Sequence, residues 1–313
     1  MGQRGEVKNG MNGNLAAENK LLEDASPPKT FIALVRSGGK YLQSLGIGDN
    51  PRLQAERLLG SLLKCRRLDL YLNAGSADPS LVEAFHALLE RRGNGEPLQY
   101  LTGEQEFLKR SFKVGQGVLI PRQETELLVR EALRYLKIGP FIDLGTGSGC
   151  IGISLLLESK EAVQGFGLDF SEEAIAYARE NAQSLGIVPR SLHFRTGDLF
   201  SPLPAQLRNS FEMIVSNPPY LNMHLDKIEP SVRLFEPRVA LDGGEGGIKV
   251  YERIFSEAGL WLKCGGFLIL EIGYNQKAAI LNLLKKFPFL KVINVTRDEQ
   301  DIDRVMTMIY DPV

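Results

Sequence analysis

The chain of 313 residues is 43% hydrophobic and carries 37 basic against 38 acidic residues, a formal net charge of −1. A chain of this length can bury one large core or two unequal ones, and we expect two domains. The near-neutral charge predicts no general basic surface and no direct nucleic-acid partner. The three cysteines and three histidines are scattered without ligand spacing, so we expect neither a disulfide framework nor a metal site.

The first 29 residues are polar and rich in Asn and Gly. They have no apolar stretch for a secretory signal and are too acidic for a typical transit peptide. We interpret residues 1–29 as a disordered extension. Because no apolar run in the sequence is long enough to span a bilayer, we expect no membrane partner and a cytoplasmic location.

Residues 30–95 have a helical pattern. Apolar residues recur from Ala55 to Leu63 at spacings i, i+3, i+4, i+7 and i+8, which is one stripe on a helix. Asp78 and Pro79 supply an N-cap and a first-turn proline for another helix. We therefore expect a small helical N-terminal domain.

Residues 96–120 change character. Short apolar runs at 106–108, 111–114 and 118–120, separated by glycines, predict a hairpin that links two domains. Pro121 is then expected to open a helix.

From residue 121 to residue 313 the pattern becomes an alternation of strands and helices. Strands are expected at 141–144, 165–169, 193–196, 213–216, 267–272, 291–295 and 304–310. Such alternation predicts a doubly wound α/β sheet with mainly parallel strands.

A glycine-rich loop, Asp-Leu-Gly-Thr-Gly-Ser-Gly at residues 143–149, follows the first of these strands. Glycine allows positive φ and lets a ligand approach the backbone without meeting a Cβ. In open α/β sheets the ligand crevice lies at the carboxyl ends of the strands, where this loop is placed. Asp169 ends the next strand, and its carboxylate can accept both ribose hydroxyls of an adenosine.

The register of this loop separates two cofactors. Residues 147–152 match GxGxxG, the dinucleotide fingerprint, but that fingerprint should begin at the strand end, and here the strand ends before Gly145. The register favours S-adenosylmethionine over NAD, although the loop alone leaves a dinucleotide and a structural turn open. After the third strand, Asp198 and the backbone of Leu199 can read an adenine edge. The candidate cofactor-binding residues are Gly145, Thr146, Gly147, Ser148, Gly149, Asp169, Asp198, Leu199 and Asn217.

The sequence Asn217-Pro218-Pro219-Tyr220 ends the fourth strand. Two consecutive prolines cannot extend a central strand, so the chain leaves the sheet rigidly here. An amide or arylamine nitrogen is a poor nucleophile because its lone pair is delocalised. The Asn217 side-chain oxygen and the Pro218 carbonyl can accept its two N–H bonds and aim the lone pair at a methyl group. With Tyr220 as a flat face against the planar group, we predict Asn217, Pro218 and Tyr220 as catalytic residues for methyl transfer to a planar nitrogen.

Together these motifs resemble the protein-(glutamine-N5) methyltransferase family, from about residue 50 to the C-terminus. Further matching segments are residues 95–103, 106–107, 120–126, 235–238 and 271–273. Two departures are present. Gln123 replaces a proline in the family's Ile-Pro-Arg-Pro-Glu-Thr-Glu, and residues 297–304 lack the family's usual Ala-Gly pair.

The resemblance implies a helical N-terminal domain that helps to hold a protein substrate, followed by a seven-stranded, Rossmann-like methyltransferase sheet. It implies methyl transfer from S-adenosylmethionine to the side-chain amide nitrogen (N5) of the glutamine in the Gly-Gly-Gln loop of peptide chain release factors. It also assigns that glutamine to Asn217, Pro218, Pro219 and Tyr220, with Phe107 as a candidate pocket wall.

Three other functions compete with this interpretation, beside NAD-dependent oxidoreduction. Methylation of a ribosomal-protein glutamine would share every catalytic residue. Adenine-N6 methylation of nucleic acid shares Asn-Pro-Pro-Tyr, but it should show a basic face or a target-recognition domain. A non-catalytic cofactor-binding scaffold would have no reason to keep residues 217–220.

Overall fold

The computed structural model describes residues 30–72, 75–159, 163–223 and 225–312. The expected disordered extension, residues 1–29, lies outside the described residues. The chain forms two compact units that divide between Thr102 and Gly103. The domain boundaries after residues 95 and 120 stay predictions from the sequence.

The first unit is helical, as expected. Its helices are α2 (Phe31–Ser44), α3 (Pro51–Leu63), α4 (Asp69–Leu72), α5 (Pro79–Gly93) and α6 (Leu98–Thr102). They share one core in which Leu34, Leu58 and Phe85 are fully buried. The predicted cap at Asp78 is confirmed, since its carboxylate accepts the Leu81 N–H at 2.8 Å.

The second unit begins with an antiparallel hairpin of β1 (Glu104–Phe107) and β2 (Arg110–Lys113). The predicted third run at 118–120 is wrong as a strand, because Ile120 donates its N–H to the Glu236 carboxylate instead of to a neighbouring strand. The helix expected at Pro121 is also displaced. Helix α7 (Glu124–Tyr135) begins three residues later, and Arg122 in the segment before it donates to Glu236.

Seven strands form the sheet of the second unit, which confirms the predicted fold class. They are β3 (Phe141–Leu144), β4 (Gly165–Asp169), β5 (Leu192–Thr196), β6 (Phe211–Ser216), β7 (Leu262–Glu271), β8 (Leu290–Arg297) and β9 (Asp303–Tyr310). Their order is β5-β4-β3-β6-β7-β9-β8, and β9 alone runs antiparallel to its neighbours. The chain reverses its direction of winding between β3 and β6, which is where open α/β sheets bind ligands.

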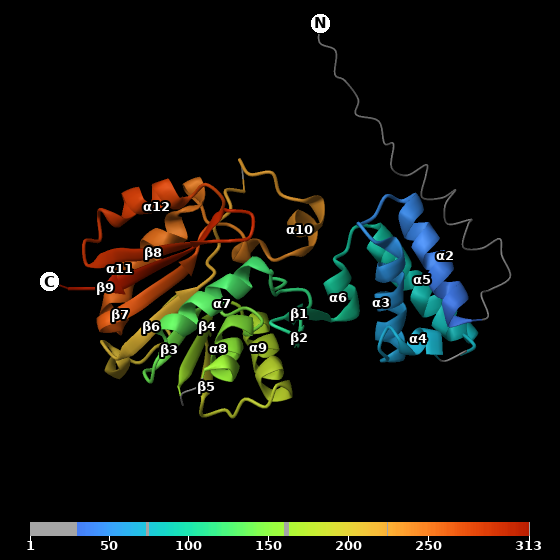
Figure 1. The fold of residues 1–313 in the computed structure, drawn as a ribbon, viewed down its shortest axis with the longest axis horizontal. Helices are drawn as coiled ribbons and strands as arrows, with labels where there is room; N and C mark the ends of the chain where they lie inside the picture. Colours follow the sequence, from blue (N-terminus) through green and yellow to red (C-terminus); the bar gives the residue numbers. More distant parts are fainter. Residues whose placement is uncertain (1–29, 73–74, 160–162, 224, 313) are drawn as a thin grey trace, which may run out of the picture. The chain divides into compact units, whose positions relative to one another are not determined.

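Helices cover both faces of this sheet (Figure 1). Besides α7 they are α8 (Cys150–Glu158), α9 (Glu172–Ser184), α11 (Lys249–Trp261) and α12 (Lys277–Leu284). The short helix α10 (Pro230–Phe235) has no buried residue, and short 3₁₀ turns occur at Ala205–Leu207, Arg238–Ala240 and Glu245–Gly247. Strand residues alternate between the faces. Phe141 packs with α7 and α8, whereas Ile142 packs with α11 and α12.

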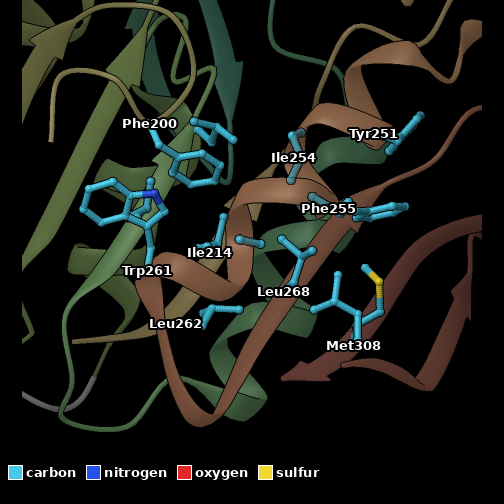
Figure 2. Packing of buried hydrophobic residues seen from close by; sticks show 14 of the residues in the cluster. Phe200, Ile214, Tyr251, Ile254, Phe255, Trp261, Leu262, Leu268 and Met308 are labelled. Atoms are coloured by element: carbon cyan, nitrogen blue, oxygen red, sulfur yellow. The ribbon is translucent and has the colours of Figure 1, made fainter. Parts of the chain in front are cut away.

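Large aromatic side chains dominate the core on the α11 side. Figure 2 shows Phe200 beside Trp261, the last residue of α11, with Ile254 and Phe255 further along that helix, all buried. The Phe200 and Trp261 rings stack with centroids 6.1 Å apart. This packing anchors the loop after β5, which carries part of the site, to helix α11. None of the helices in the described ranges is both long and apolar enough to cross a membrane.

Candidate active site

A cavity of about 410 Å³ opens at the carboxyl ends of the parallel strands, within the size range of small-molecule sites. The loops after β3, β4, β5 and β6 each contribute to its wall, in residues 144–148, 168–171, 197–199, 217 and 219. Parts of the segments 117–122 and 237–242, together with Thr125, supply further lining. The structure thus brings together the four groups of residues that the sequence placed at separate strand ends.

The glycine loop after β3 presents open backbone to this cavity. Gly145 and Gly147 have φ angles of 72° and 56°, in the left-handed region that side chains rarely adopt. A Cβ added at Gly145 would meet no atom within 4 Å. The N–H groups of Gly145 and Thr146 both donate to the Leu168 carbonyl, which fixes the loop against β4.

Asp169, at the end of β4, links the two loops beside it. One carboxylate oxygen accepts the Gly147 N–H at 2.8 Å, and the other accepts the Ser171 N–H at 2.9 Å. Burial raises the pKa of this carboxyl, while the backbone hydrogen bonds oppose the rise. Each oxygen retains a lone pair for a hydroxyl group of a ligand.

A second carboxyl supports the loop from behind. Asp143 is fully buried, and one of its oxygens accepts the Thr146 hydroxyl at 2.6 Å and the Gly152 N–H at 2.9 Å. Burial raises the pKa of Asp143 to about 6. Asp143 therefore ties the glycine loop to the first turn of α8.

The loop after β5 reaches the cavity in a different way from the prediction. Asp198 lines the cavity, but its carboxylate pairs with Arg253 of α11 at 2.7 Å. Leu199 also lines the cavity and has a φ of 46°, unusual for a residue with a side chain. Both predicted residues are therefore present, with the Asp198 charge shared with Arg253.

Asn217 stands immediately after β6, next to the glycine loop, because β6 pairs with β3. The Ser216 hydroxyl donates to the Leu144 carbonyl at 2.6 Å, which joins the ends of the two strands. Asn217 donates its Nδ2–H to the Thr125 hydroxyl at 3.0 Å, and Thr125 donates to Glu271 Oε2 at 2.7 Å. Burial raises the pKa of Glu271 to about 7.

The rest of the Asn-Pro-Pro-Tyr loop is held by close backbone packing. A Cβ at Gly243 would lie 2.8 Å from the Pro219 carbonyl oxygen and from the Tyr220 Cα, so only glycine fits this contact. Gln276 donates to the Tyr220 carbonyl at 2.8 Å. This explains why a glycine-rich turn, 243–247, follows the motif in the fold.

Not every predicted site residue lines the cavity. Asn217 and Pro219 do, but Pro218 is buried and the Tyr220 ring packs toward the α11 and α12 core. Phe107 is buried in contact with Phe112, in the hydrophobic cluster that includes Leu128 and Val129 of α7. The roles of Pro218, Tyr220 and Phe107 stay predictions.

Two buried carboxyls had no assigned role in the sequence. Glu271 supports Thr125, and Glu236 accepts Arg122 at 2.6 Å and joins the two segments that line the cavity at 117–122 and 237–242. Glu271 ends an apolar strand, a position where a charged residue is a usable signal in a single sequence. Among the described residues no group of three or more His, Cys, Asp or Glu side chains could hold a metal ion.

Comparisons with known proteins agree with this architecture. Residues 33–103 match the family described as PrmC N-terminal domain, and residues 137–273 match a methyltransferase domain. The chain is 40% identical to a release factor glutamine methyltransferase of Geobacter sulfurreducens over 85% of this chain and 92% of the relative. It is 37% identical to a release factor glutamine methyltransferase of Thermodesulfovibrio yellowstonii over 82% of this chain and 91% of the relative. A solved protein-(glutamine-N5) methyltransferase from Alicyclobacillus acidocaldarius shares 28% identity, covering 64% of this chain and 100% of that one, with a TM-score of 0.37.

The seven-stranded sheet, the helical N-terminal unit and the methyltransferase match define a Rossmann-like methyltransferase with an added helical domain. Identity of 40% over 92% of a relative is well beyond what shared fold alone would give. The chain belongs to the release factor glutamine methyltransferase family.

Proposed function

We propose that this protein transfers a methyl group from S-adenosylmethionine to the side-chain amide nitrogen of the glutamine in the Gly-Gly-Gln loop of peptide chain release factors. The observation that carries the proposal is Asn217, which lines the cavity beside the glycine loop and whose Nδ2 donates to the Thr125 hydroxyl. The names of the relatives supply the substrate class. Because release factors act in translation, we place the reaction in the cytoplasm.

The cavity fits the proposed cofactor on features of this chain. Gly145 leaves open space where a Cβ would otherwise intrude, and Asp169 has acceptor capacity for ribose hydroxyls. Leu199 supplies an apolar wall. When bound, S-adenosylmethionine supplies a methyl group on a positively charged sulfonium, which is the electrophile.

The task of the protein is then to present a weak nucleophile. Asn217 Oδ1 accepts one N–H of the substrate carboxamide, and the Pro218 carbonyl accepts the other, so that the nitrogen lone pair is directed toward the cofactor side of the cavity. The nitrogen can lose a proton to water after methylation, so no base has to act before transfer. Positioning of this kind lowers a barrier by up to ~7–11 kcal/mol.

The test is methylation of purified release factor with labelled S-adenosylmethionine, followed by peptide mass spectrometry. One added methyl on the Gly-Gly-Gln glutamine is expected, and a factor with that glutamine replaced by asparagine should stay unlabelled. Ribosomal proteins, DNA and RNA are run in parallel. Methylation of a ribosomal protein or of adenine, with the release factor unmodified, would overturn the proposal.

The matched variant is Asn217→Ala. Loss of one preorganised polar group typically lowers kcat by ~10²–10³, while cofactor affinity should stay close to that of the wild type, because the glycine loop and Asp169 are untouched. Single-turnover methylation beside calorimetry of cofactor binding separates the two effects. A fall in turnover of less than about fivefold would make Asn217 a structural loop residue.

A further inference from the structure

Three side chains from distant parts of the chain, Asn217, Thr125 and Glu271, form a hydrogen-bonded series. The Thr125 hydroxyl, at the start of α7, donates to Glu271 Oε2 at 2.7 Å and accepts from Asn217 Nδ2 at 3.0 Å. Thr125 is 2% exposed and lies at the wall of the cavity, and Glu271 behind it is 1% exposed. The proposed mechanism uses only Asn217 and leaves the other two without a role.

The series determines which end of the Asn217 carboxamide faces the cavity. The oxygen and the NH₂ group of a carboxamide are alike in shape, so only their hydrogen-bond partners select between the two orientations. A threonine hydroxyl carries a single proton. When the Thr125 hydroxyl uses that proton in its hydrogen bond to Glu271, its oxygen can only accept a hydrogen bond from Asn217. The only donor on the Asn217 side chain is Nδ2.

We propose that Thr125 and Glu271 are positioning residues that hold Asn217 with its Oδ1 toward the substrate. This rests on the proposed function, in which Oδ1 accepts an N–H of the glutamine side chain. In the reversed orientation the cavity would present an NH₂ donor to the NH₂ of the substrate. The two donors would repel each other, and the substrate nitrogen would lose the contact that orients it.

The ionisation of Glu271 then controls the orientation. Burial raises the pKa of Glu271 to about 7, while Thr125 and the charge of Arg304 oppose the rise. The other charged or titratable groups that face it are Arg122, Glu124, Cys150, Tyr220 and Tyr251. Arg304 and Arg122 are themselves paired, with Asp298 and Glu236. Within the described part of the chain, Glu271 forms no ion pair of its own.

A proton on Glu271 reverses the series. The protonated carboxyl donates to the Thr125 oxygen, the hydroxyl turns its own proton toward Asn217, and Oδ1 must rotate inward to accept it. Activity is therefore present above the pKa of Glu271 and is lost as the pH falls through it. The expected fall is up to tenfold for each pH unit below that value, since the competent fraction follows the ionised carboxylate.

The test compares Thr125→Val, which keeps the shape but removes the hydroxyl, with Thr125→Ser, which keeps the hydroxyl. For Thr125→Val, single-turnover methylation of release factor should fall by roughly 10- to 100-fold, below the loss typical for a direct contact. Its KM for the factor and its affinity for the cofactor should change less than about threefold. Thr125→Ser should recover turnover to within about threefold of the wild type. Equal losses in both variants would overturn the proposal.

A matched control comes from another buried threonine. The Thr307 hydroxyl donates to Glu131 at 3.4 Å, in β9 and away from Asn217. Thr307→Val should lower the melting temperature without lowering turnover. Glu271→Gln is the second arm, because a carboxamide cannot ionise. Its turnover should be independent of pH between pH 6 and 8, a range set by the Glu271 pKa of about 7, whereas the wild type shows an acid limb. An unchanged acid limb in Glu271→Gln would contradict the role of Glu271.

A readout without catalysis separates this proposal from the proposed function. In ¹⁵N spectra of the full-length protein, the Asn217 side-chain NH₂ is identified by its absence in Asn217→Ala. Its inward proton should be protected from solvent exchange in the wild type and in Thr125→Ser, and should exchange at least tenfold faster in Thr125→Val. Equal protection in Thr125→Val would overturn the positioning series even if release factor is methylated. If the proton loses its protection in Thr125→Val but the wild type does not methylate release factor, only the proposed function is overturned.

Discussion

Replacement of Asp169 with alanine should weaken the binding of S-adenosylmethionine more than any other single change in the glycine-loop region. The carboxylate accepts N–H groups from Gly147 at 2.8 Å and Ser171 at 2.9 Å, and the proposed ribose hydroxyls are its remaining donors. Hydrogen bonds to a charged group contribute ~1.5–3 kcal/mol. At about 1.4 kcal/mol for each factor of ten, Kd should rise roughly 10- to 150-fold.

Isothermal calorimetry with S-adenosylmethionine and with its demethylated product measures this change, and thermal melting reports any loss of fold. Asp311→Ala is the matched control, since Asp311 does not line the cavity and its part-exposed pair with Lys291 is worth ~0–1 kcal/mol. Asp169→Asn should not restore affinity, because its NH₂ would face one of the two backbone N–H donors. If Asp169→Ala binds within threefold of the wild type, the ribose assignment and the loop-organising role are both wrong.

Three further outcomes are expected. Gly243→Ala places a methyl group 2.8 Å from the Pro219 carbonyl oxygen. It should lower turnover by roughly tenfold or more in single-turnover assays while cofactor affinity stays unchanged. Unaltered turnover would show that the loop tolerates the displacement. Phe255→Ala removes a fully buried ring from the core of Figure 2 and should destabilise the second unit by ~3–5 kcal/mol in urea unfolding; a loss below about 1 kcal/mol would contradict the packing described. Burial raises the pKa of Glu271 from 4.5 to about 7, so the folded protein binds more protons than the unfolded chain in that window. Stability should therefore fall by up to roughly 3 kcal/mol as pH rises from about 4.5 to 7, and in Glu271→Gln this component should be absent when unfolding is followed at pH 5 and pH 8.

Local patterns in the sequence were sufficient for the sheet and for the strand-end loops that line one part of the cavity. Apolar runs predict six of the seven strands to within two residues at each end, because each is a short segment bounded by polar turns. Strand β7 begins at Leu262, five residues before the predicted start at 267. The glycine loop and Asp169 were found because they occupy strand ends. The start of α7 was missed by three residues. Arg122 and Ile120 are held by Glu236, more than 100 residues away, and no local pattern carries that contact.

The support for Asn217 was missed for the same reason. Thr125 and Glu271 belong to segments, 120–126 and 271–273, that the family resemblance singled out without giving them a task. Thr125 is 92 positions from Asn217 and 146 positions from Glu271 along the chain. A single sequence shows which polar residues are unusual, but only the fold shows which of them meet.

The pairing of β3 with β6 has a consequence for accuracy. Its register matches Ile142 with Ile214 and Asp143 with Val215, so the next positions bring the glycine loop level with Asn217. A parallel ladder can slip only in whole residues of about 3.3 Å, and a slip of one would also turn every side chain to the opposite face. An error of about 1 Å in a reacting geometry can cost 10²-fold in rate. The register of the ladder can therefore change only in steps of a whole residue. Because no intermediate register exists, small drifts in the spacing between methyl donor and acceptor are forbidden.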